Sequence, residues 1–383
     1  MSALESVTRN SVDVLPAGEL ERKLAKGRPL RVKLGVDPTS PDVHLGFAVV
    51  LDRLREWQDA GHTVVLIVGD YTARIGDPSG RSEERPVLAD EIIDANAKEF
   101  AHQAFRVLDP DRTEIRFNGE WLGNLSYAEV VRLARTITVA RILERDDFAK
   151  RFRDHEPISI SELLYPLMQA YDSVAIEADI EIGGTDQLYN LLTGRDVMSD
   201  YGLDPQMVIT YPLLVGTDGV EKMSKSRGNY VGITDPPAEI FGKTMSIPDS
   251  ALPQWWEMLV ADSSHPDDPM QWKLELARRL VRRWHGDEAV TAAEEHFTRV
   301  VREHRPPEEI EEIKIPNPPD PILLPSLLAT VTGESSSHWR RVIEQGGVKI
   351  DGEPVESFEV PYSALEGRVV QAGKRRFMRF SAA

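Results

Sequence analysis

The 383-residue sequence contains no cysteine, has fewer basic than acidic residues, and has no long apolar run. Without cysteine the chain can form no disulfide, zinc–thiolate site, iron–sulfur cluster or cysteine nucleophile, which fits a reducing compartment. Lys and Arg number 45 against 63 Asp and Glu, so the formal net charge of −18 excludes a cationic coat for nucleic acid. An RNA partner would therefore have to be held by local basic patches.

Targeting segments and membrane segments are not indicated either. The first 28 residues mix charged and apolar side chains, and apolar stretches such as Val64–Val68 are far shorter than the roughly 20 residues of a membrane helix. We therefore expect a soluble cytoplasmic protein with no signal peptide and no membrane anchor. The length leaves room for two or three domains.

The beginning of the chain predicts a parallel α/β fold. Residues 30–36 alternate as in a strand, a helix is expected after Asp42 and before Gly61, and the β-branched run 63–68 predicts a second strand. Strand, helix and strand in this order form a βαβ unit. Such units join parallel strands, and ligands then collect at the carboxyl ends of the strands.

The remainder of the chain predicts further helices and a small terminal module. Residues 88–154 are expected to be mainly helical, followed by a helix at 158–174, a strand at 178–182, a helix at 186–198 and a strand at 208–215. Pro166 should either kink the helix at 158–174 or open a second helix there. Helices are expected again from Tyr230 to residue 310. A proline-rich run at 315–325 indicates a linker, and the module after it has more basic than acidic residues.

Two segments at the predicted strand ends could bind phosphate or an ammonium group. Asp37, Thr39 and His44 lie where the first strand leads into a helix, a position that favours anions, and Gly46 would let a flat base approach. A helix-start histidine and a packing glycine explain these residues equally well. After the second strand come the carboxylate of Asp77 and the guanidinium groups of Arg81 and Arg85. Taken alone, that segment is better explained as a surface turn.

The segment Lys222-Met-Ser-Lys-Ser226 carries a stronger signal. It lies between turn-forming residues, so we expect it on a mobile loop. Lys222 and Lys225 could reach phosphate oxygens and stabilise the charge that develops as pyrophosphate departs. A solvated basic loop is the alternative, but a five-residue match rarely arises by chance.

These motifs resemble those of a known family. His44-Leu-Gly-Phe47 and Lys222–Ser226, in this order, resemble the two signatures of class I aminoacyl-tRNA synthetases. Tyr165–Asp172 and Ile182–Asn190 resemble, more specifically, the tyrosyl-tRNA synthetases of bacteria. Residues 342–352 and 373–379 resemble the small RNA-binding domain that this family shares with a ribosomal protein. The resemblance extends from about residue 30 to about residue 380.

The resemblance implies an α/β architecture: a Rossmann-like parallel-sheet catalytic domain, a helical domain and a small α+β RNA-binding domain. The implied bounds are 1–232 for the catalytic domain, with a helical dimerisation insertion at about 105–155, 233–314 for a helical anticodon-side domain, 315–325 for the linker and 326–383 for the RNA-binding domain. The implied reaction activates tyrosine with ATP to tyrosyl-adenylate and pyrophosphate and transfers tyrosine to the 3′-terminal ribose of tRNA(Tyr). Mg²⁺ would enter with ATP, with no tightly bound cofactor and no protein metal site, and the protein would be a homodimer.

The resemblance also assigns residues. For tyrosine these are Lys33, Asp77, Tyr165, Gln169, Asp172 and Gln187, with Asp172 at the phenolic hydroxyl, Gln187 at the carboxylate, and Asp77, Tyr165 and Gln169 at the ammonium. For catalysis they are Thr39, His44, Lys222, Lys225, Arg81 and Arg85. For ATP they are Gly35, Asp37, Gly46, Phe47, Gly184, Asp186, Met223 and Lys225. For RNA they are Arg340, Arg341, Lys349, Lys374, Arg375 and Arg376.

Physical reasoning supports the tyrosine site. Tyr165, Gln169 and Asp172 stand at i, i+4 and i+7, so an unbroken helix places them on one face, which is better explained as a pocket wall than as core packing. A buried carboxylate there would be left unpaired by phenylalanine. Two positions depart from the family pattern: Phe47 stands in place of a second histidine, and Lys33 stands where many relatives have tyrosine.

Two other functions remain possible on the sequence. A catalytically altered paralogue that acts as an RNA-binding regulator is suggested by Phe47, although Lys222, Lys225, Asp77 and Asp172 are all present. An adenylyltransferase that uses no tRNA would share the histidine–glycine signature, but it would leave the basic terminal module without a purpose.

Overall fold

The computed structural model describes residues 7–78, 89–260, 262, 264–303, 306, 310–373 and 376–382. It forms two compact units, residues 1–235 with 243–276, and residues 236–242 with 277–383. The helical domain expected at 233–314 is therefore divided between the two units. The physical reason is that part of it belongs to the core of the first unit: Gln254 Nε2 donates a hydrogen bond to the carbonyl of Leu213, and Trp255 Nε1 to that of Val215.

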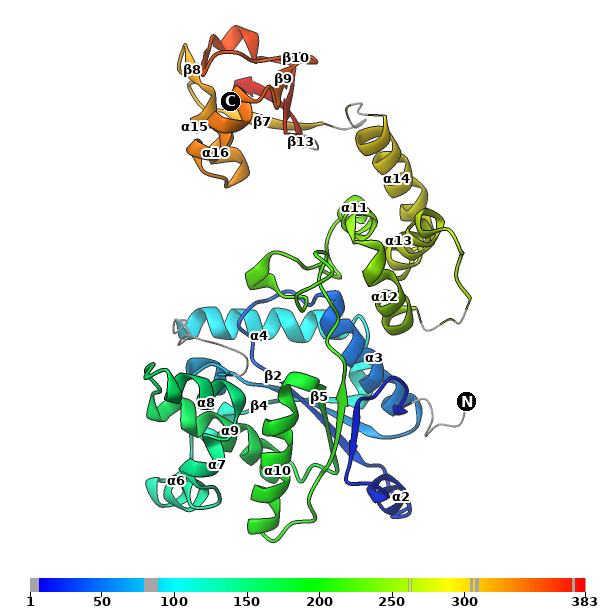
Figure 1. Ribbon diagram of the computed structural model, residues 1–383, viewed down its shortest axis with the longest axis vertical. Helices are drawn as coiled ribbons and strands as arrows, with labels where there is room; N and C mark the ends of the chain where they lie inside the picture. Colours follow the sequence, from blue (N-terminus) through cyan, green and yellow to red (C-terminus); the bar gives the residue numbers. More distant parts are fainter. Residues whose placement is uncertain are drawn as a thin grey trace. The chain divides into compact units, whose positions relative to one another are not determined.

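The first unit is built on a six-stranded sheet with helices on both sides. The strand order is β1-β6-β5-β2-β3-β4, with β1 antiparallel to β6 and the other neighbours parallel. The strands are β1 (Asp13–Leu15), β2 (Arg31–Val36), β3 (Thr63–Val68), β4 (Thr113–Phe117), β5 (Ile180–Gly184) and β6 (Met207–Tyr211). The helices are α2 (Glu19–Leu24), α3 (Leu45–Asp59), α4 (Asp90–Ala104), α5 (Gly119–Leu122), α6 (Tyr127–Ala134), α7 (Val139–Ile142), α8 (Asp146–Arg153), α9 (Ile160–Ala175), α10 (Leu188–Asp200) and α12 (Leu252–Leu259). Figure 1 shows α3 and α4 on one side of the sheet and α9 and α10 on the other.

The strand order reverses at β2, which creates an opening at the carboxyl end of the sheet. From β2 the chain builds outward through β3 and β4, then returns to the other side of β2 with β5 and β6. The register of β2 with β5 includes only Val32 and Lys33, so the two strands separate beyond that point. Gly35 is consequently exposed although it lies in a central strand. Ligands of open α/β sheets bind at such a reversal point.

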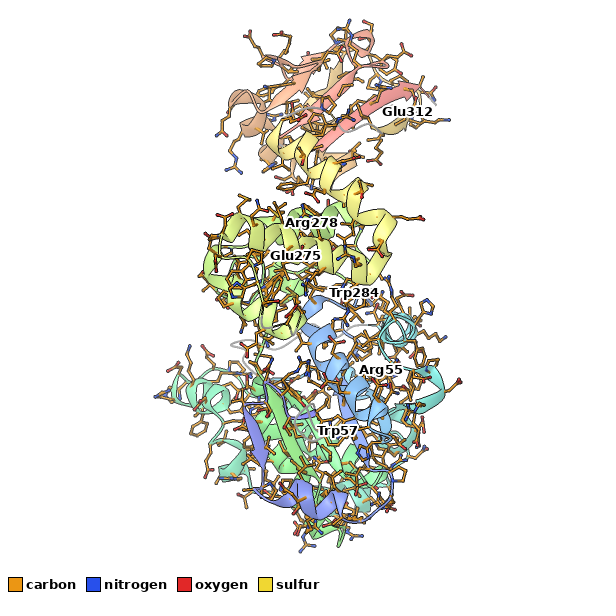
Figure 2. All side chains as sticks on the ribbon, turned by 90° about the vertical axis from the view of Figure 1, so that its right-hand side faces the viewer. Arg55, Trp57, Glu275, Arg278, Trp284 and Glu312 are labelled. Carbon is orange, nitrogen blue, oxygen red and sulfur yellow. The ribbon has the colours of Figure 1, made fainter. Side chains whose placement is uncertain are left out.

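The sequence pattern explains the central elements well. The β-branched run of β3 is almost completely buried because it has neighbours on both edges and helices on both faces. On α3, the Trp57 side chain is buried (Figure 2). Helix α9 runs through Pro166 without a break, so no second helix begins there. Packing along α10 holds this helix together, since Leu167 and Ala170 share a buried cluster with Val197.

The prediction of a mainly helical segment at 88–154 missed a strand. Between α4 and α5 lies β4, which extends the sheet in parallel next to β3. Its residues are only half buried, and the alternation of Ile115 and Phe117 with the charged Glu114 and Arg116 covers only five residues. Arg31 of β2 reaches Glu114 with two hydrogen bonds of 2.8 Å, which favours the pairing at this edge.

The second unit contains a smaller sheet with the strand order β10-β9-β12-β13-β7. Its elements are α14 (Asp287–Phe297), β7 (Glu311–Ile315), β8 (Ile322–Leu323), α15 (Leu324–Thr332), α16 (Ser336–Glu344), β9 (Val348–Ile350), β10 (Glu353–Pro354), β11 (Glu359–Val360), β12 (Val369–Ala372) and β13 (Arg376–Ala382), while α11 (Pro237–Ser246) and α13 (Pro269–His285) run across the residue boundaries of the two units. Because β7 pairs in parallel with β13, the sheet includes residues before 326. The proline-rich run is therefore a loop inside this α+β layer, which corrects its interpretation as a linker between domains.

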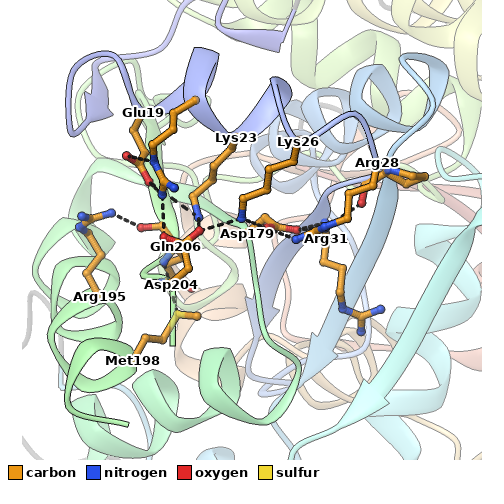
Figure 3. Close-up of polar contacts among 12 residues, drawn as sticks. Glu19, Lys23, Lys26, Arg28, Arg31, Asp179, Arg195, Met198, Asp204 and Gln206 are labelled. Carbon is orange, nitrogen blue, oxygen red and sulfur yellow. Dashed lines mark hydrogen bonds and ion pairs between the residues drawn. The ribbon is translucent and has the colours of Figure 1, made fainter. Parts of the chain in front are cut away.

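A network of ion pairs closes the amino end of the larger sheet (Figure 3). Asp179, directly before β5, accepts two hydrogen bonds from Arg28, of 2.7 and 2.8 Å, and one from Lys26. Asp204, shortly before β6, accepts from Lys26 at 2.7 Å and from the completely buried Lys23 at 3.2 Å. Each of these carboxylates thus meets at least two cations.

Within the described ranges, no helix is both long enough and apolar enough to cross a membrane.

Candidate active site

The predicted site residues meet at the carboxyl end of the large sheet, around the reversal point. Asp37 follows β2 and accepts a hydrogen bond of 2.9 Å from the hydroxyl of Tyr165 on α9. Gln187, just after β5, donates a hydrogen bond of 2.8 Å to Asp77. Lys222 pairs with Asp186 at 2.7 Å. Residues far apart in the chain therefore lie together at this end of the sheet.

Asp172 forms a buried carboxylate at one end of this site. Its side chain on α9 is 3% exposed and accepts hydrogen bonds from Trp121 Nε1 at 2.8 Å and from Asn118 Nδ2 at 3.3 Å. Burial raises the pKa of Asp172 to about 7, although the charge of Lys33 and the two hydrogen bonds oppose this rise. Asp172 is thus a strong hydrogen-bond acceptor in apolar surroundings, suited to a hydroxyl donor.

A chain of hydrogen bonds connects Asp172 with Asp37. Asn118 Nδ2 donates to Thr72 Oγ1 at 3.0 Å as well as to Asp172, and Thr72 Oγ1 donates to Asp37 at 2.7 Å. Asp37 also accepts a hydrogen bond from the hydroxyl of Tyr165. These bonds hold two carboxylates and a tyrosine in fixed positions, which is the preorganisation that selective binding requires.

The buried side chain of Gln169 carries a hydrogen-bond acceptor that receives no hydrogen bond from the described residues. Its side chain is buried, and its Oε1 atom has no hydrogen-bond partner among the residues that the structure describes. An unpaired buried carbonyl is costly, typically by about 1–3 kcal/mol, so this atom favours a ligand that donates a hydrogen bond. An ammonium group would be such a donor.

Lys33 is placed differently from the expectation that it contacts the substrate. Its ammonium group is completely buried and pairs with Glu181 at 2.9 Å, while donating to Ser173 Oγ at 2.7 Å and to the carbonyl of Gln169 at 3.1 Å. Three protein partners satisfy an ammonium group. Lys33 is therefore engaged behind the site, where its charge favours the ionised form of Asp172.

His44 and Phe47 form an aromatic wall at the start of α3. His44 is the residue that precedes the first helical turn, and burial, together with the charge of Lys222, lowers its pKa to about 4, so the imidazole is neutral at pH 7. The ring of Phe47 packs against His44, with centroids 4.7 Å apart, and against Phe100 at 5.6 Å. Phe47, which stands in place of the second histidine of the family pattern, is thus accommodated by packing against these two rings. Gly46 leaves room for the imidazole, because a Cβ there would lie 3.0 Å from His44 Cε1.

The loop that carries Lys222 and Lys225 is tied down by ion pairs. Lys222 pairs with Asp186, and Lys225 pairs with Asp42 and lies 5.5 Å above the ring of Tyr230. Burial lowers the pKa of Lys225. Between them the Met223 side chain is buried and anchors the loop. Each lysine can bind phosphate oxygens only after its ion pair with the aspartate breaks.

Two glycines differ in the space around them. At Gly35 a Cβ atom would meet nothing within 4 Å, which agrees with its exposure in the opening between β2 and β5. At Gly184 a Cβ would lie 2.6 Å from Leu213 and 2.8 Å from Asp186. Gly184 is therefore required by packing, whereas Gly35 leaves space for a ligand.

The other predicted residues either lie outside the described residues or make none of the contacts given above. Thr39 follows β2 with an exposed side chain. Arg81, Arg85, Lys374 and Arg375 lie outside the described residues. In the second unit Arg340 and Arg341 are exposed on α16, and the strand register places Lys349 and Arg376 on opposite faces of the sheet. In the part of the chain that is described, no group of three or more acidic or histidine side chains could hold a metal ion.

Four important residues were not found from the sequence: Thr72, Asn118, Trp121 and Asn190. Asn118 and Trp121 were hidden because β4, which precedes them, was missed. Thr72 lies in a short helical turn after β3, where no motif or periodicity marked it. Asn190 ends the motif Ile182–Asn190 but was given no role, although its spacing of three from Gln187 could have indicated contact.

Comparison with known proteins identifies the family of this chain. A family described as tRNA synthetases class I (W and Y) matches residues 25–302. A relative from Thermotoga maritima named tyrosine–tRNA ligase is 49% identical over 97% of this chain and 96% of its own length. One of the same name from Moorella thermoacetica is 47% identical over 98% of this chain and 95% of its own length.

Solved structures have the same fold. The tyrosyl-tRNA synthetase of Archaeoglobus fulgidus, determined with L-tyrosine, aligns with 75% of this chain and 98% of its own, with a TM-score of 0.61 and 23% identity. The tyrosyl-tRNA synthetase of Aeropyrum pernix aligns with 76% of this chain and 97% of its own, with a TM-score of 0.61 and 22% identity. From its sequence match and its site, the chain belongs to the class I tRNA synthetases of the W and Y type.

Proposed function

We propose that this protein is a tyrosine–tRNA ligase. It activates tyrosine with ATP to tyrosyl-adenylate and pyrophosphate, then transfers the tyrosyl group to the 3′-terminal ribose of tRNA(Tyr). The observation that carries this proposal is the wall formed by α9: the buried carboxylate of Asp172 near its end, and the unmatched acceptor of Gln169 one turn earlier. A side-chain hydroxyl and an α-ammonium group satisfy these two features together.

Tyrosine would bind along α9. The phenolic hydroxyl donates a hydrogen bond to Asp172, whose orientation Trp121 and Asn118 fix. The ammonium group meets Gln169 Oε1 and the carboxylate of Asp77, with Tyr165 beside it. Gln187 lies at the tyrosine carboxylate. Phenylalanine would leave Asp172 desolvated without a donor, and that penalty discriminates between the two amino acids.

Activation is an in-line attack of the tyrosine carboxylate on the α-phosphorus of ATP. The protein contributes positioning and charge stabilisation rather than a covalent intermediate. We assign the ATP site to the opening at Gly35, with Asp37, Gly46, Phe47, Gly184, Asp186 and Met223 around it. Mg²⁺ would enter with the ATP phosphates, held by them and by water.

The ion pairs of the loop suggest how pyrophosphate is stabilised. Asp186 now accepts from Lys222, and the ATP ribose would compete for that carboxylate. Lys222 would then be available to the phosphates, as would Lys225 once it leaves Asp42. Thr39, the neutral imidazole of His44, Arg81 and Arg85 are the further donors that we assign to the departing group.

Transfer to tRNA, assembly and location complete the proposal. The proposed RNA contacts are Arg340, Arg341, Lys349, Lys374, Arg375 and Arg376, so charging of tRNA should weaken steeply with salt.

The exposed apolar side chains of the helical insertion support a homodimer that covers them. Tyr127, Val139 and Phe152 are 84, 57 and 63% exposed. We place the protein in the cytoplasm, where tRNA charging takes place.

The first test is tyrosine-dependent exchange of labelled pyrophosphate into ATP without tRNA, with phenylalanine and tryptophan as controls. Exchange with tyrosine alone would support the proposed activation and show that Phe47 is tolerated. Absence of exchange with any amino acid would contradict it. Charging of tRNA(Tyr) by the same preparation then tests the second step.

A further inference from the structure

A continuous row of polar side chains connects the helical insertion to Asp77. Arg145 Nη1 donates to Asn190 Oδ1 at 3.2 Å, Asn190 Nδ2 donates to Gln187 Oε1 at 3.0 Å, and Gln187 Nε2 donates to Asp77 Oδ2 at 2.8 Å. Arg145 and Asn190 are both buried. Arg145 lies outside the motifs that resemble the family, and Asn190 is the last residue of one of them but has no assigned role.

The chemistry of the two ends determines how both amides are oriented. A guanidinium group only donates hydrogen bonds, so the oxygen of Asn190 must face Arg145 and its NH₂ group must face Gln187. A carboxylate only accepts when ionised, so the NH₂ group of Gln187 must face Asp77. The bonds therefore point in one direction along the whole row, from Arg145 to Asp77.

Arg145 is itself firmly held. Its guanidinium group donates to Asp147, at 2.8 Å through Nε, and packs over the rings of Phe148 and Tyr189 at 4.8 and 5.6 Å. Arg145 precedes the first turn of α8 within the helical insertion, whereas Tyr189 and Asn190 belong to α10. The start of the row is thus a rigid junction between two helices.

We infer that Arg145 and Asn190 are positioning residues for the amino-acid substrate: they orient the amide of Gln187, which in turn holds the carboxylate of Asp77 toward the substrate ammonium. The inference rests on the proposed tyrosine activation and extends it to two residues that touch neither substrate. If the amide of Gln187 turned over, its oxygen would face the oxygen of Asp77. The resulting repulsion would displace the group that recognises the ammonium.

Asn190→Asp is the decisive variant, because it separates positioning from folding. The new carboxylate is nearly isosteric and pairs better with Arg145, so the packing and the thermal stability are expected to be kept or raised. It can only accept, however, so Gln187 must turn its NH₂ group toward residue 190 and its oxygen toward Asp77. We expect the KM for tyrosine to rise about tenfold, with kcat and the KM for ATP changed less than threefold.

Thr193→Val is the matched control. Thr193 is buried one turn further along α10, and its hydroxyl donates to the carbonyl of Tyr189 without joining the row. This variant changes a buried polar group on the same helix and should leave the KM for tyrosine unchanged. Arg145→Lys, which keeps a cation but loses the planar fork, should raise that KM about threefold and serves as a second variant if Asn190→Asp does not fold.

The unaltered protein is measured alongside by pyrophosphate exchange and by calorimetric binding of tyrosine. Absence of exchange in the unaltered protein contradicts the proposed function itself. With exchange intact there, an equal KM for tyrosine in Asn190→Asp and Thr193→Val overturns the positioning role. A fall in melting temperature that accompanies the rise in KM would also overturn it, because it would assign Asn190 a merely structural role.

Discussion

Two buried aspartates at opposite ends of the large sheet show how one fold uses the same side chain for two purposes. Asp179 at the amino end and Asp172 near the carboxyl end are each 3% exposed. Burial favours the neutral form of both, but the hydrogen bonds and charges of Arg28 and Lys26 lower the pKa of Asp179. Burial raises the pKa of Asp172 to about 7, because its bonded partners, Trp121 and Asn118, are uncharged.

The two ends of the sheet also differ in other polar contacts. At the amino end, carboxylates and cations pair with each other (Figure 3). At the carboxyl end, Gln169 Oε1 and His44 Nδ1 have no hydrogen-bond partner among the described residues, and Gly35 faces open space. A site must keep groups unsatisfied until its ligand arrives, so it forgoes stability that the other end retains.

The largest expected effect is at the loop of the carboxyl end. Changing Lys222 and Lys225 together to Ala should lower kcat for adenylate formation about 10³-fold, roughly 4 kcal/mol, because two donors to the departing pyrophosphate are lost. Tyrosine affinity should stay within about twofold. Single-turnover formation of adenylate and equilibrium binding of tyrosine measure the two quantities.

Lys243→Ala is the control for that change. The Nζ atom of Lys243 lies 5.2 Å from the ring of Tyr230, much as that of Lys225 does at 5.5 Å, but Lys243 pairs with Asp235. Its removal should leave kcat nearly unchanged. Equal losses of catalysis and of tyrosine affinity in the double variant would contradict the assigned role.

The next effect concerns the aspartate at the carboxyl end. Asp172→Asn should lower kcat/KM for tyrosine about 100-fold, since an amide is a weaker acceptor and its NH₂ group would oppose Trp121 or Asn118. In the unaltered protein tyrosine should bind more tightly as pH rises through about 7 and Asp172 ionises. Steady-state kinetics between pH 6 and 8 would detect this dependence, and its persistence in the variant would exclude Asp172 as its source.

The same change at the amino end gives the opposite pattern. Asp179→Asn should lower the free energy of unfolding by about 2 kcal/mol, because it leaves Arg28 without its charged partner and Lys26 with Asp204 alone, and should leave the KM for tyrosine unchanged. The folded pKa of Asp179 is lowered, so its stabilisation is present above the unfolded pKa, near 4, and is lost as pH falls further.

Urea denaturation at pH 7 and at pH 3 measures this prediction. The difference in stability between the unaltered protein and Asp179→Asn should shrink at pH 3. A difference that is the same at both pH values would show that the carboxylate charge is not what stabilises this end of the sheet.

The smallest expected effect comes from comparing two glycines: Gly35, which faces open space, and Gly183, which is closely packed. Gly35→Val should keep or slightly raise the melting temperature, because valine favours strands and a Cβ meets no atom within 4 Å, but it should raise the KM for ATP about tenfold. Gly183→Ala is the contrast, since its Cβ would lie 3.3 Å from both Gln187 and Leu191 and should lower stability. An unchanged KM for ATP in Gly35→Val would place the nucleotide elsewhere.

Local signals made much of the site predictable. The central strands and α3 follow from periodicity, and the spacing of Tyr165, Gln169 and Asp172 placed all three on one helix face. The weak points were elements stabilised by their neighbours: the alternation in β4 covers only five residues at an edge of the sheet, and contacts such as Arg31 with Glu114 hold the strand. Helix α9 likewise continues through Pro166, since packing on α10 offsets the missing hydrogen bond.

The sequence by itself determined the fold class, the family and most of the residues around the site, because motifs and periodicities are local properties of the chain. Only the tertiary structure decided that Lys33 is engaged with Glu181 behind the site, that Asn118 and Trp121 orient Asp172, and that the proline-rich run lies inside an α+β layer. Such facts depend on which distant residues meet, and a partner that is far away in the chain leaves no mark on the local pattern.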